Sequence, residues 1–335
     1  MPKNIQLSLI IPIYNRPQEA EEILESLSKQ TDMDFEVVIV EDGSTQRCEE
    51  VVNKYSGKIA LKYFYKENTG PGDSRNFGCR MASGNYFVIL DSDCIVPPHY
   101  INTVKKNLSA NYADAWGGPD KAHQSFTNLQ KGINFSMTSL FTTGGIRGGS
   151  EKIGKFQPRS FNMGISREVF EKTGGFGRVH PGEDPDLTFR IWKAGFKTTL
   201  FSNAYVYHKR RIDWSKFARQ MYKFGVTRVM LNKWHPGTGK ITYWFPMAFS
   251  SAFIISLITL PLTPWPITLF AIYFFVLFFD ALILNRSLWV ALYALVAVNV
   301  QFFSYGWGFL KAQIRINLLR KSPEKAFPSF FFKVN

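Results

Sequence analysis

Two long stretches near the C-terminus of this 335-residue chain contain no charged residue, from position 241 to 279 and from 287 to 310. Crossing the hydrocarbon core of a bilayer takes a helix of about 20 apolar residues, and a buried helix of a soluble protein rarely needs so many in a row. We therefore expect the C-terminal quarter to lie in a membrane. The candidate spans are residues 245–262, 267–284 and 287–310, separated by a Thr-Pro-Trp-Pro break and by Asn285-Arg286.

The net charge of +14 is concentrated on both sides of these stretches. Residues 205–240 contain nine Lys or Arg and one acid, and residues 311–335 contain six and one. Basic flanks are typical of the cytoplasmic side of a membrane segment and attract anionic lipid headgroups. The sequence thus predicts a cytosolic domain at 1–240 with basic membrane-proximal helices at 212–240, membrane segments at 241–310 and a basic cytosolic tail at 311–335. The expected location is the plasma (inner) membrane, with membrane lipids as partners.

The number of membrane segments stays open at two or three. Three crossings would place the basic tail on the far side, against the positive-inside tendency, unless one segment is re-entrant or interfacial. A buried hairpin of a soluble protein fits poorly, because such helices normally show one polar face. Nucleic acid is a competing partner for a basic chain, but no DNA- or RNA-binding motif accompanies these charges, and we expect no nucleic acid partner.

The first 100 residues alternate between short apolar runs and amphipathic segments. Near-continuous apolar strands separated by amphipathic helices indicate a mostly parallel sheet covered on both faces. This is a Rossmann-like, doubly wound α/β fold, whose ligands bind beyond the carboxyl ends of the strands. Strands are predicted at residues 7–14, 35–40, 59–65 and 86–90, and helices at 17–30, 48–55 and 73–82.

Polar residues follow three of these strands. They are the Glu-Asp-Gly-Ser sequence at 41–44, the segment 67–76, and Asp91-Ser92-Asp93. In an Asp-x-Asp sequence on extended backbone both carboxylates point the same way, and their hard oxygens suit Mg²⁺ or Mn²⁺ bound to a diphosphate. An Asp after a strand is commonly only a turn residue. Three polar strand ends together exceed what turns require.

Six blocks within residues 5–230 resemble family 2 glycosyltransferases of the GT-A fold. In chain order they read SLIIPIYNR, VVIVEDGS, ENTGPGDSRNFG, VILDSDC, FNMGISREVFEKTGGF and GEDPDLTFRIWKAGF. The resemblance implies transfer of a sugar from a nucleotide diphosphate-sugar, usually with a divalent cation, here Mg²⁺ or Mn²⁺. Some members of this family carry C-terminal membrane helices, in agreement with the apolar stretches.

The resemblance assigns several residues to the nucleotide and the metal. Asp42 would bind the nucleobase, in a pocket shaped by Pro12 and Tyr14. Asp91 would contact the ribose or the metal, and Asp93 would ligate the metal.

The Gly-Asp-Ser-Arg block adds further donor contacts. Arg75 would face the nucleotide, and Asn68 and Gly70 would keep the preceding turn close to it. The alternative for Arg75 is a solvated charge on a helix, since most surface arginines are no more than that.

The Gly-Glu-Asp block carries the predicted chemistry. By resemblance, Asp184 is the catalytic base, and one carboxylate near the acceptor suffices to take the proton of an attacking hydroxyl. Glu183 would bind the acceptor, or it and Asp186 would support the site through a pair with Arg190 one helical turn on. Because a helix is predicted at 187–194, the alternative role for Asp184 is helix capping.

Other positions by resemblance concern the acceptor and the cation. Asn162, Met163 and Gly164 would form the floor of the acceptor site. His208 stands where some relatives place a metal or diphosphate ligand, although a lone His is more often structural. The Gly-rich, basic loop at 146–161 would close over the donor or be a plain surface loop.

One departure from the family concerns processivity. Polysaccharide synthases of this family carry Gln-x-x-Arg-Trp, where this chain has Lys223 and Phe224 in the last two positions. Lys lacks the guanidinium fork of Arg, and Phe lacks the indole donor of Trp. We therefore expect a membrane-anchored, inverting, non-processive glycosyltransferase that acts on a lipid-linked saccharide or another glycan. The alternatives are transfer to a polyprenyl phosphate, and a non-catalytic membrane scaffold that retains the sugar-nucleotide fold.

Overall fold

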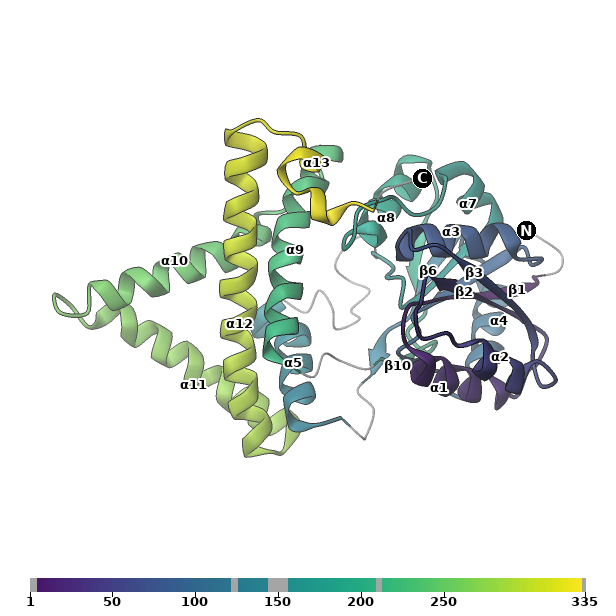
Figure 1. The fold of residues 1–335 in the computed structure, drawn as a ribbon. Helices are drawn as coiled ribbons and strands as arrows, with labels where there is room; N and C mark the ends of the chain where they lie inside the picture. The colour runs from purple at the N-terminus through teal and green to yellow at the C-terminus, as the bar shows by residue number, and fades with distance from the viewer. Residues whose placement is uncertain (1–4, 122–125, 144–155, 209–212, 333–335) are drawn as a thin grey trace. The chain divides into compact units, whose positions relative to one another are not determined.

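The computed structural model describes residues 5–121, 126–143, 156–208 and 213–332, with the side chain of His208 left out. The chain forms two compact units (Figure 1). The first comprises Met1–His123, Glu151–Lys209 and Ser329–Asn335, and the second comprises Gln124–Ser150 and Arg210–Pro328. This division differs from the expected boundary at residue 240, because an internal segment joins the second unit and the end of the chain joins the first.

A seven-stranded sheet forms the centre of the first unit, with the order β3-β2-β1-β4-β8-β6-β9. Strands β3, β2, β1 and β4 are parallel, whereas β8 runs antiparallel to both β4 and β6. The sheet is therefore mostly parallel, as the apolar runs predicted. The strands are β1 (Leu7–Ile13), β2 (Glu36–Asp42), β3 (Ala60–Lys66), β4 (Tyr86–Leu90), β6 (Ala115–Gly117), β8 (Asn162–Ser166) and β9 (Thr198–Leu200).

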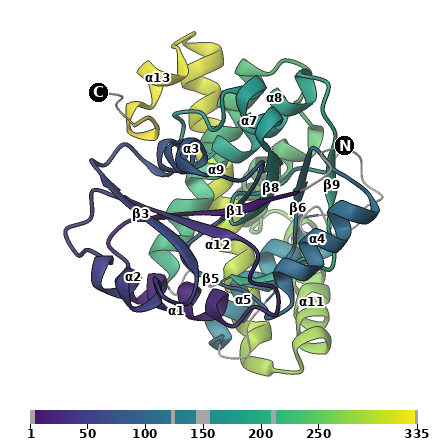
Figure 2. The same ribbon diagram turned by 90° about the vertical axis from the view of Figure 1, so that its right-hand side faces the viewer.

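Helices cover both faces of this sheet (Figure 2). One face packs on α1 (Pro17–Ser28), α2 (Glu49–Tyr55) and α4 (Tyr100–Ala110), and the other on α3 (Pro71–Met81), α7 (Arg167–Thr173) and α8 (Glu183–Lys193). Along β1, Leu9 and Ile11 enter the first core and Ile10 enters the second. Since side chains alternate across a strand, a strand buried on both faces must be apolar throughout. This arrangement confirms the doubly wound α/β class.

Two helices begin earlier than the periodicity predicted. Pro71 opens α3, in the first turn where a missing N–H costs nothing. Glu183 opens α8 directly after Gly182, so the Gly-Glu-Asp block is itself helical. A small second sheet, β5 (Cys94–Ile95), β10 (Val206–His208) and β7 (Asp120–Lys121), follows β4 in the same unit.

The second unit is helical. A 3₁₀ turn (Ile241–Trp244) precedes α10, and a π-helical turn (Gln313–Leu318) follows α12. In the described part of the chain, three helices are long and apolar enough to cross a membrane, within Ile241–Ile258, Trp265–Asn285 and Leu288–Leu318. The helices are α5 (Asn128–Thr138), α6 (Leu140–Thr143), α9 (Trp214–Trp234), α10 (Phe245–Ile258), α11 (Trp265–Asn285), α12 (Leu288–Ala312) and α13 (Pro323–Ala326).

Candidate active site

The loops after β1 and β2 are joined by one asparagine. Asn15 adopts a left-handed conformation with φ 54°, which Asn tolerates better than most residues. Its backbone N–H donates to Ser44 Oγ at 2.8 Å, and its Oδ1 accepts from the N–H groups of Thr45 at 2.8 Å and Gln46 at 3.0 Å. These bonds fix the carboxyl edge of the sheet around the Glu-Asp-Gly-Ser block.

Asp42 holds the turn that leads into α3. Its carboxylate accepts from the N–H groups of Thr69 at 3.0 Å and Gly70 at 2.9 Å, and it pairs with Lys66 Nζ at 2.6 Å. The side chain is only 4% exposed. The carboxylate predicted to bind the nucleobase therefore already holds the turn before α3 through its hydrogen bonds. Pro12 is half-buried, whereas Tyr14 and Asn68 are exposed at the same edge.

Arg75 lies buried at the centre of the acidic groups. Its Nη2 contacts Asp91 Oδ1 at 2.7 Å and its Nη1 contacts Glu183 Oε1 at 3.1 Å, with only 4% of the residue exposed. The alternative of a solvated helix charge is wrong, because the guanidinium bridges the end of β4 and the start of α8. A planar fork suits this double pairing better than an ammonium would.

Asp184 lies beside this bridge, in the first turn of α8. The residue that caps the helix is Gly182, with φ 124°, so the capping role considered for Asp184 is wrong. The carboxylate of Asp184 accepts a hydrogen bond from Ser160. Its Oδ1 is buried without a hydrogen-bond partner among the described residues. A buried, unsatisfied carboxylate oxygen is a site at which a ligand proton would be accepted.

The electrostatic surroundings of the two acids differ. Burial, followed by the charge of Glu183, raises the pKa of Asp184 above the usual aspartate range. Burial also acts to raise the pKa of Glu183, but His180, whose Nδ1 lies 3.0 Å from Glu183 Oε1, and Arg75 outweigh it and lower that pKa. Titratable groups whose pKa values are pushed apart are how active sites separate their roles.

Asp91 and Asp93 follow β4 on the same edge. Asp93 Oδ2 lies 3.8 Å from Arg16 Nη1, and Arg16 also pairs with Glu19 at 2.8 Å. Both Asp91 and Asp93 act electrostatically on Arg16, which places the two carboxylates near one cation. Residues 5–121, 126–143, 156–208 and 213–332 contain no group of three or more His, Cys, Asp or Glu able to hold a metal.

The predicted acceptor residues lie inside the sheet. Asn162 and Met163 are 0% exposed in β8, and the amide of Asn162 bonds to Tyr100 Oη at 2.6 Å and to the carbonyl of Ala204 at 2.8 Å. A Cβ on Gly164 would meet the indole of Trp116 at 2.1 Å. In this structure the three positions serve packing, and none of their side chains reaches the surface.

The end of the chain contributes to the same edge. The N–H of His180 donates to the carbonyl of Phe330 at 2.8 Å, and Val179 forms an antiparallel bridge with Phe331. The ring of Phe332 lies so close to Gly70, where φ is 95°, that an added Cβ would meet it at 2.3 Å. One short segment thus contacts the residue that Asp42 binds and the residue that holds Glu183.

Several site residues were not predicted from sequence. They are Asn15, Arg16, Ser160, His180 and Phe332. The pairs His180–Glu183 and Arg16–Glu19, each three residues apart, were local signals, whereas the other contacts join distant parts of the chain. Conversely, the side chain of His208, the two arginines after Lys209, and residues 146–155 of the predicted donor loop lie outside the described residues.

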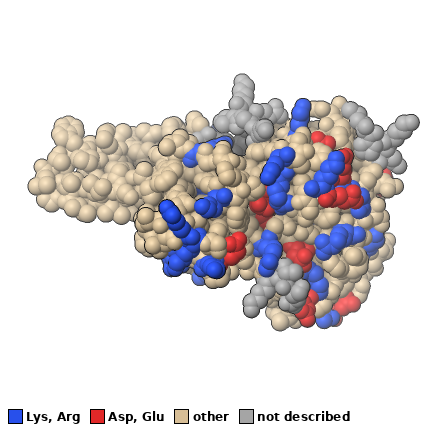
Figure 3. All heavy atoms as spheres, turned by 90° about the horizontal axis from the view of Figure 1, so that it is seen from above, with Lys and Arg blue, Asp and Glu red and all other residues tan. Residues whose placement is uncertain are grey.

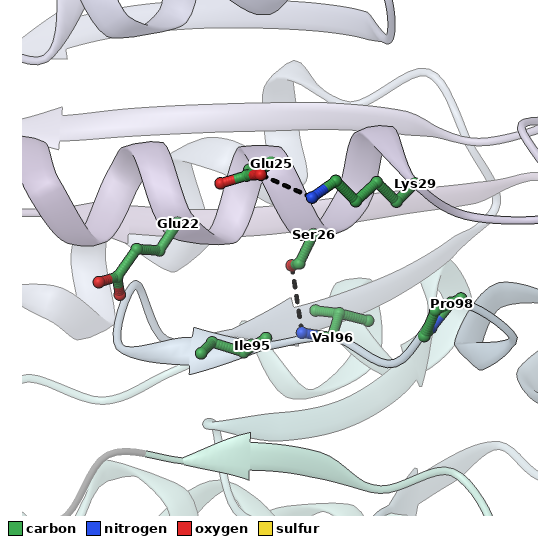
Figure 4. A pocket seen from close by; sticks show the side chains of 7 residues that line it. All are labelled: Glu22, Glu25, Ser26, Lys29, Ile95, Val96 and Pro98. Carbon is green, nitrogen blue, oxygen red and sulfur yellow. Dashed lines mark hydrogen bonds and ion pairs between the residues drawn. The ribbon is translucent and has the colours of Figure 1, made fainter. Parts of the chain in front are cut away.

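A cavity lies away from these acids. It has a volume of about 350 Å³ and is lined by residues of α1 and of the segment around β5 (Figure 4). A hydrogen bond from the N–H of Val96 to Ser26 Oγ at 3.1 Å joins its two walls, and the Lys29 to Glu25 ion pair at 2.6 Å lies along the α1 wall. None of its lining residues belongs to the predicted site.

Comparison with known proteins gives a consistent result for this unit. The family described as Glycosyl transferase family 2 matches residues 8–174. A protein of Rickettsia bellii named as an uncharacterized glycosyltransferase is 38% identical over 91 residues, which is 27% of this chain and 13% of that protein. One of Haemophilus influenzae with the same name is 31% identical over 194 residues, 55% of this chain and 61% of that protein. The chain therefore spans less than two thirds of each of these relatives.

A solved structure shares the fold over nearly the whole chain. It is the mannosyltransferase PcManGT from Pyrobaculum calidifontis, in complex with GDP-Man and Mn²⁺. The match covers 96% of this chain and 89% of that protein, with a TM-score of 0.58 and 20% sequence identity. At this identity the likeness concerns the fold.

Proposed function

We propose that this chain, whose residues 8–174 match Glycosyl transferase family 2, is a glycosyltransferase of the GT-A fold that transfers a sugar from a nucleotide diphosphate-sugar with inversion. The observation that carries the proposal is the position of Asp184. It combines a raised pKa with a buried, unpartnered Oδ1, beside the bridge of Asp91, Arg75 and Glu183. A base that operates near neutral pH needs such a raised pKa.

The chemistry is a single displacement. The acceptor oxygen attacks the anomeric carbon, the bond from that carbon to the diphosphate breaks, and the diphosphate leaves with the electron pair. Asp184 takes the proton of the acceptor. Glu183 is the weaker base because Arg75 and His180 stabilise its charge. It would orient the acceptor and keep Arg75 in place.

The Asp-x-Asp residues fit a divalent cation. Asp91 and Asp93 offer hard oxygens at one rim, and Mg²⁺ is commonly held by one or two carboxylates together with substrate phosphates. When bound, the cation would neutralise the diphosphate. The Mn²⁺ complex of the Pyrobaculum calidifontis mannosyltransferase supports this assignment. We expect excess EDTA to abolish transfer and Mn²⁺ or Mg²⁺ to restore it, and full activity in EDTA would contradict the metal role of Asp93.

The donor and acceptor classes follow from different observations. The GDP-Man bound to that mannosyltransferase supports a nucleotide-sugar donor. The apolar helices of the second unit support a lipid-linked saccharide as acceptor, because donor, enzyme and acceptor would then meet at one surface, with the catalytic unit on the cytosolic side. Lys223 and Phe224 in α9 support one addition per encounter.

The exchange of Asp184 for Asn tests the proposal. Asn is similar in shape but cannot accept the proton, so we expect transfer to fall by a factor of about 10² to 10⁴ while donor binding is kept. Glu168→Gln is the control, because Glu168 is exposed on α7, outside the site, and pairs with Lys172 at 2.8 Å. Unchanged turnover in Asp184→Asn, or an equal loss in both variants, would remove the base assignment.

A further inference from the structure

The last described residues of the chain belong to the first unit. The carbonyl of Phe330 accepts from His180, and the N–H of Phe332 donates to the carbonyl of Arg178 at 3.3 Å. A unit hydrogen-bonded in this way lies on one side of a membrane. Since the apolar helices lie between the main body of that unit and this terminal segment, the chain crosses the membrane an even number of times. Three crossings are thereby excluded, and either one or all three of the apolar helices stay out of the bilayer.

Helix α12 is the most enclosed of the three. In the apolar stretch of each candidate span, 39% of the residues are buried for α12, 17% for the stretch that contains α10 and 11% for α11. Along most of its length α12 packs against α9 and α5 (Figure 1). Glycines bring the backbones together: a Cβ on Gly225 would meet the carbonyl oxygen of Tyr305 at 2.2 Å, and one on Gly308 would meet that of Tyr222 at 2.2 Å.

The partner helix α9 is charged at the depth that α12 would occupy. The ring of Trp214 in α9 lies beside that of Tyr293 in α12, with centroids 6.2 Å apart and the planes tilted. Further along, Gly225 of α9 lies against the backbone of Tyr305. The twelve residues from Trp214 to Gly225 therefore run beside the middle of α12, and they include three cations, Lys216, Arg219 and Lys223. A cation at the centre of a bilayer is strongly disfavoured. Placing α12 across the membrane would carry these three cations into the hydrocarbon.

The other two helices have the opposite surroundings. They project from the second unit as a hairpin (Figure 1), and the visible face of this hairpin is uncharged in Figure 3. At 1.5 Å per residue, the window at 241–258 is about 27 Å long and α11 is about 31 Å long, close to the thickness of a hydrocarbon core. The one acid, Asp280, lies in the last two turns of α11 and accepts from Ser139 Oγ at 3.2 Å.

We infer that α10 and α11 form the membrane-spanning hairpin and that α12 does not cross. Helix α12 instead belongs to a bundle with α9 and α5, on the side of the membrane that holds the first unit. Its exposed apolar stripe, Trp289, Leu292, Val296 and Trp307, is the surface of that bundle that meets the lipid interface. This inference does not depend on the proposed chemistry.

Single cysteine substitutions can show directly which side of the membrane each segment faces. The three native cysteines are buried, which keeps the background low. Lys54→Cys marks the first unit, Leu262→Cys the tip of the hairpin, and Arg286→Cys and Lys321→Cys the segments before and after α12. In vesicles of both orientations, a membrane-impermeant maleimide should label positions 54, 286 and 321 from one side and 262 only from the other. Labelling of 286 and 321 from opposite sides, or of 262 from the same side as 54 or from neither, would overturn the inference.

Charge substitution is an independent measurement that does not require labelling. Ile272 of α11 and Val296 of α12 are similarly exposed, at 56% and 48%. An arginine at Ile272 must enter the hydrocarbon, whereas one at Val296 remains at the interface. The amount of Ile272→Arg recovered in the membrane fraction should therefore fall to a small part of the wild-type amount. The amount of Val296→Arg recovered there should stay close to that of the wild type. An equal loss in the two variants would overturn the inference.

Discussion

Asp184 and Glu183 are adjacent acids whose pKa values are shifted in opposite directions. Burial and the neighbouring charge raise the pKa of Asp184. The proposed base works only when it is deprotonated, so the rate should fall as the pH drops through a range above the ordinary aspartate value of about 4. The measurement is the pH dependence of kcat/KM for the acceptor, which should show an acid limb in this raised range.

The variant Glu183→Gln tests the cause of that shift. It removes the negative charge beside Asp184, so the acid limb should move to lower pH whatever happens to the absolute rate. Glu168→Gln, on the exposed part of α7 where Glu168 pairs with Lys172, is the control and should leave the limb in place. A limb at the ordinary value, or one that Glu183→Gln does not move, would contradict the proposed base.

The sequence was sufficient to name most of these residues but not their partners. Arg75, Asp91 and Glu183 each stood in a recognisable block. Their mutual pairing joins positions 16 and 108 residues apart and depends on how β4 and α8 are placed by the sheet. For the predicted acceptor residues, the sequence did not show how far they are buried. Asn162 and Met163 were polar and apolar members of a block, and only the packing of β8 shows that both are buried.

At the scale of elements, periodicity predicted the strands well. The runs that became β1 to β4 were located within two residues, because strands buried on both faces must be continuously apolar. The antiparallel direction of β8 had no local signal, since pairing direction is set by the connection between strands. The early start of α8 was missed because Gly182 and the three acids of the first turn carry no apolar periodicity.

The terminal segment is an element with a testable role. Phe332 packs on Gly70, whose N–H binds Asp42, and its ring centroid lies 6.1 Å from that of His180, which holds Glu183. Phe332→Ala removes this contact from both parts of the site at once. Loss of a large apolar contact of about 1 to 2 kcal/mol corresponds to a rise in the donor KM of about tenfold. Steady-state kinetics with varied nucleotide-sugar would measure it.

Ser329→Ala provides the control for that measurement. Ser329 is exposed and lies three residues before Phe332, so its loss should leave the donor KM unchanged. A thermal unfolding midpoint close to that of the wild type would show that Phe332→Ala acts on the site rather than on the whole fold. An unchanged donor KM in Phe332→Ala would show that the segment is only a surface contact.

At the scale of the molecule, one long-range association was invisible in the sequence. The segment with α5 interrupts the first unit along the sequence, yet it belongs to the second unit, where Phe135 joins a core with Phe249 and Phe302. A Cβ on Gly132 would meet the backbone of Tyr293 at 2.9 Å, so only a small residue allows this approach. Such contacts depend on residues more than 100 positions away, whereas the apolar helices themselves were evident from charge and length.

The apolar helices also lead to a prediction for the proposed reaction as a whole. If the acceptor is a lipid-linked saccharide, enzyme and acceptor share one surface, and the rate depends on the acceptor per unit of lipid. In vesicles below saturation, tenfold dilution of the acceptor with carrier lipid, at constant bulk amounts of acceptor and enzyme, should lower the initial rate about tenfold. A water-soluble glycan acceptor would give a rate that does not respond to added lipid. Radiolabelled sugar transferred to the lipid phase measures the difference, and a rate independent of dilution would direct the search to soluble acceptors.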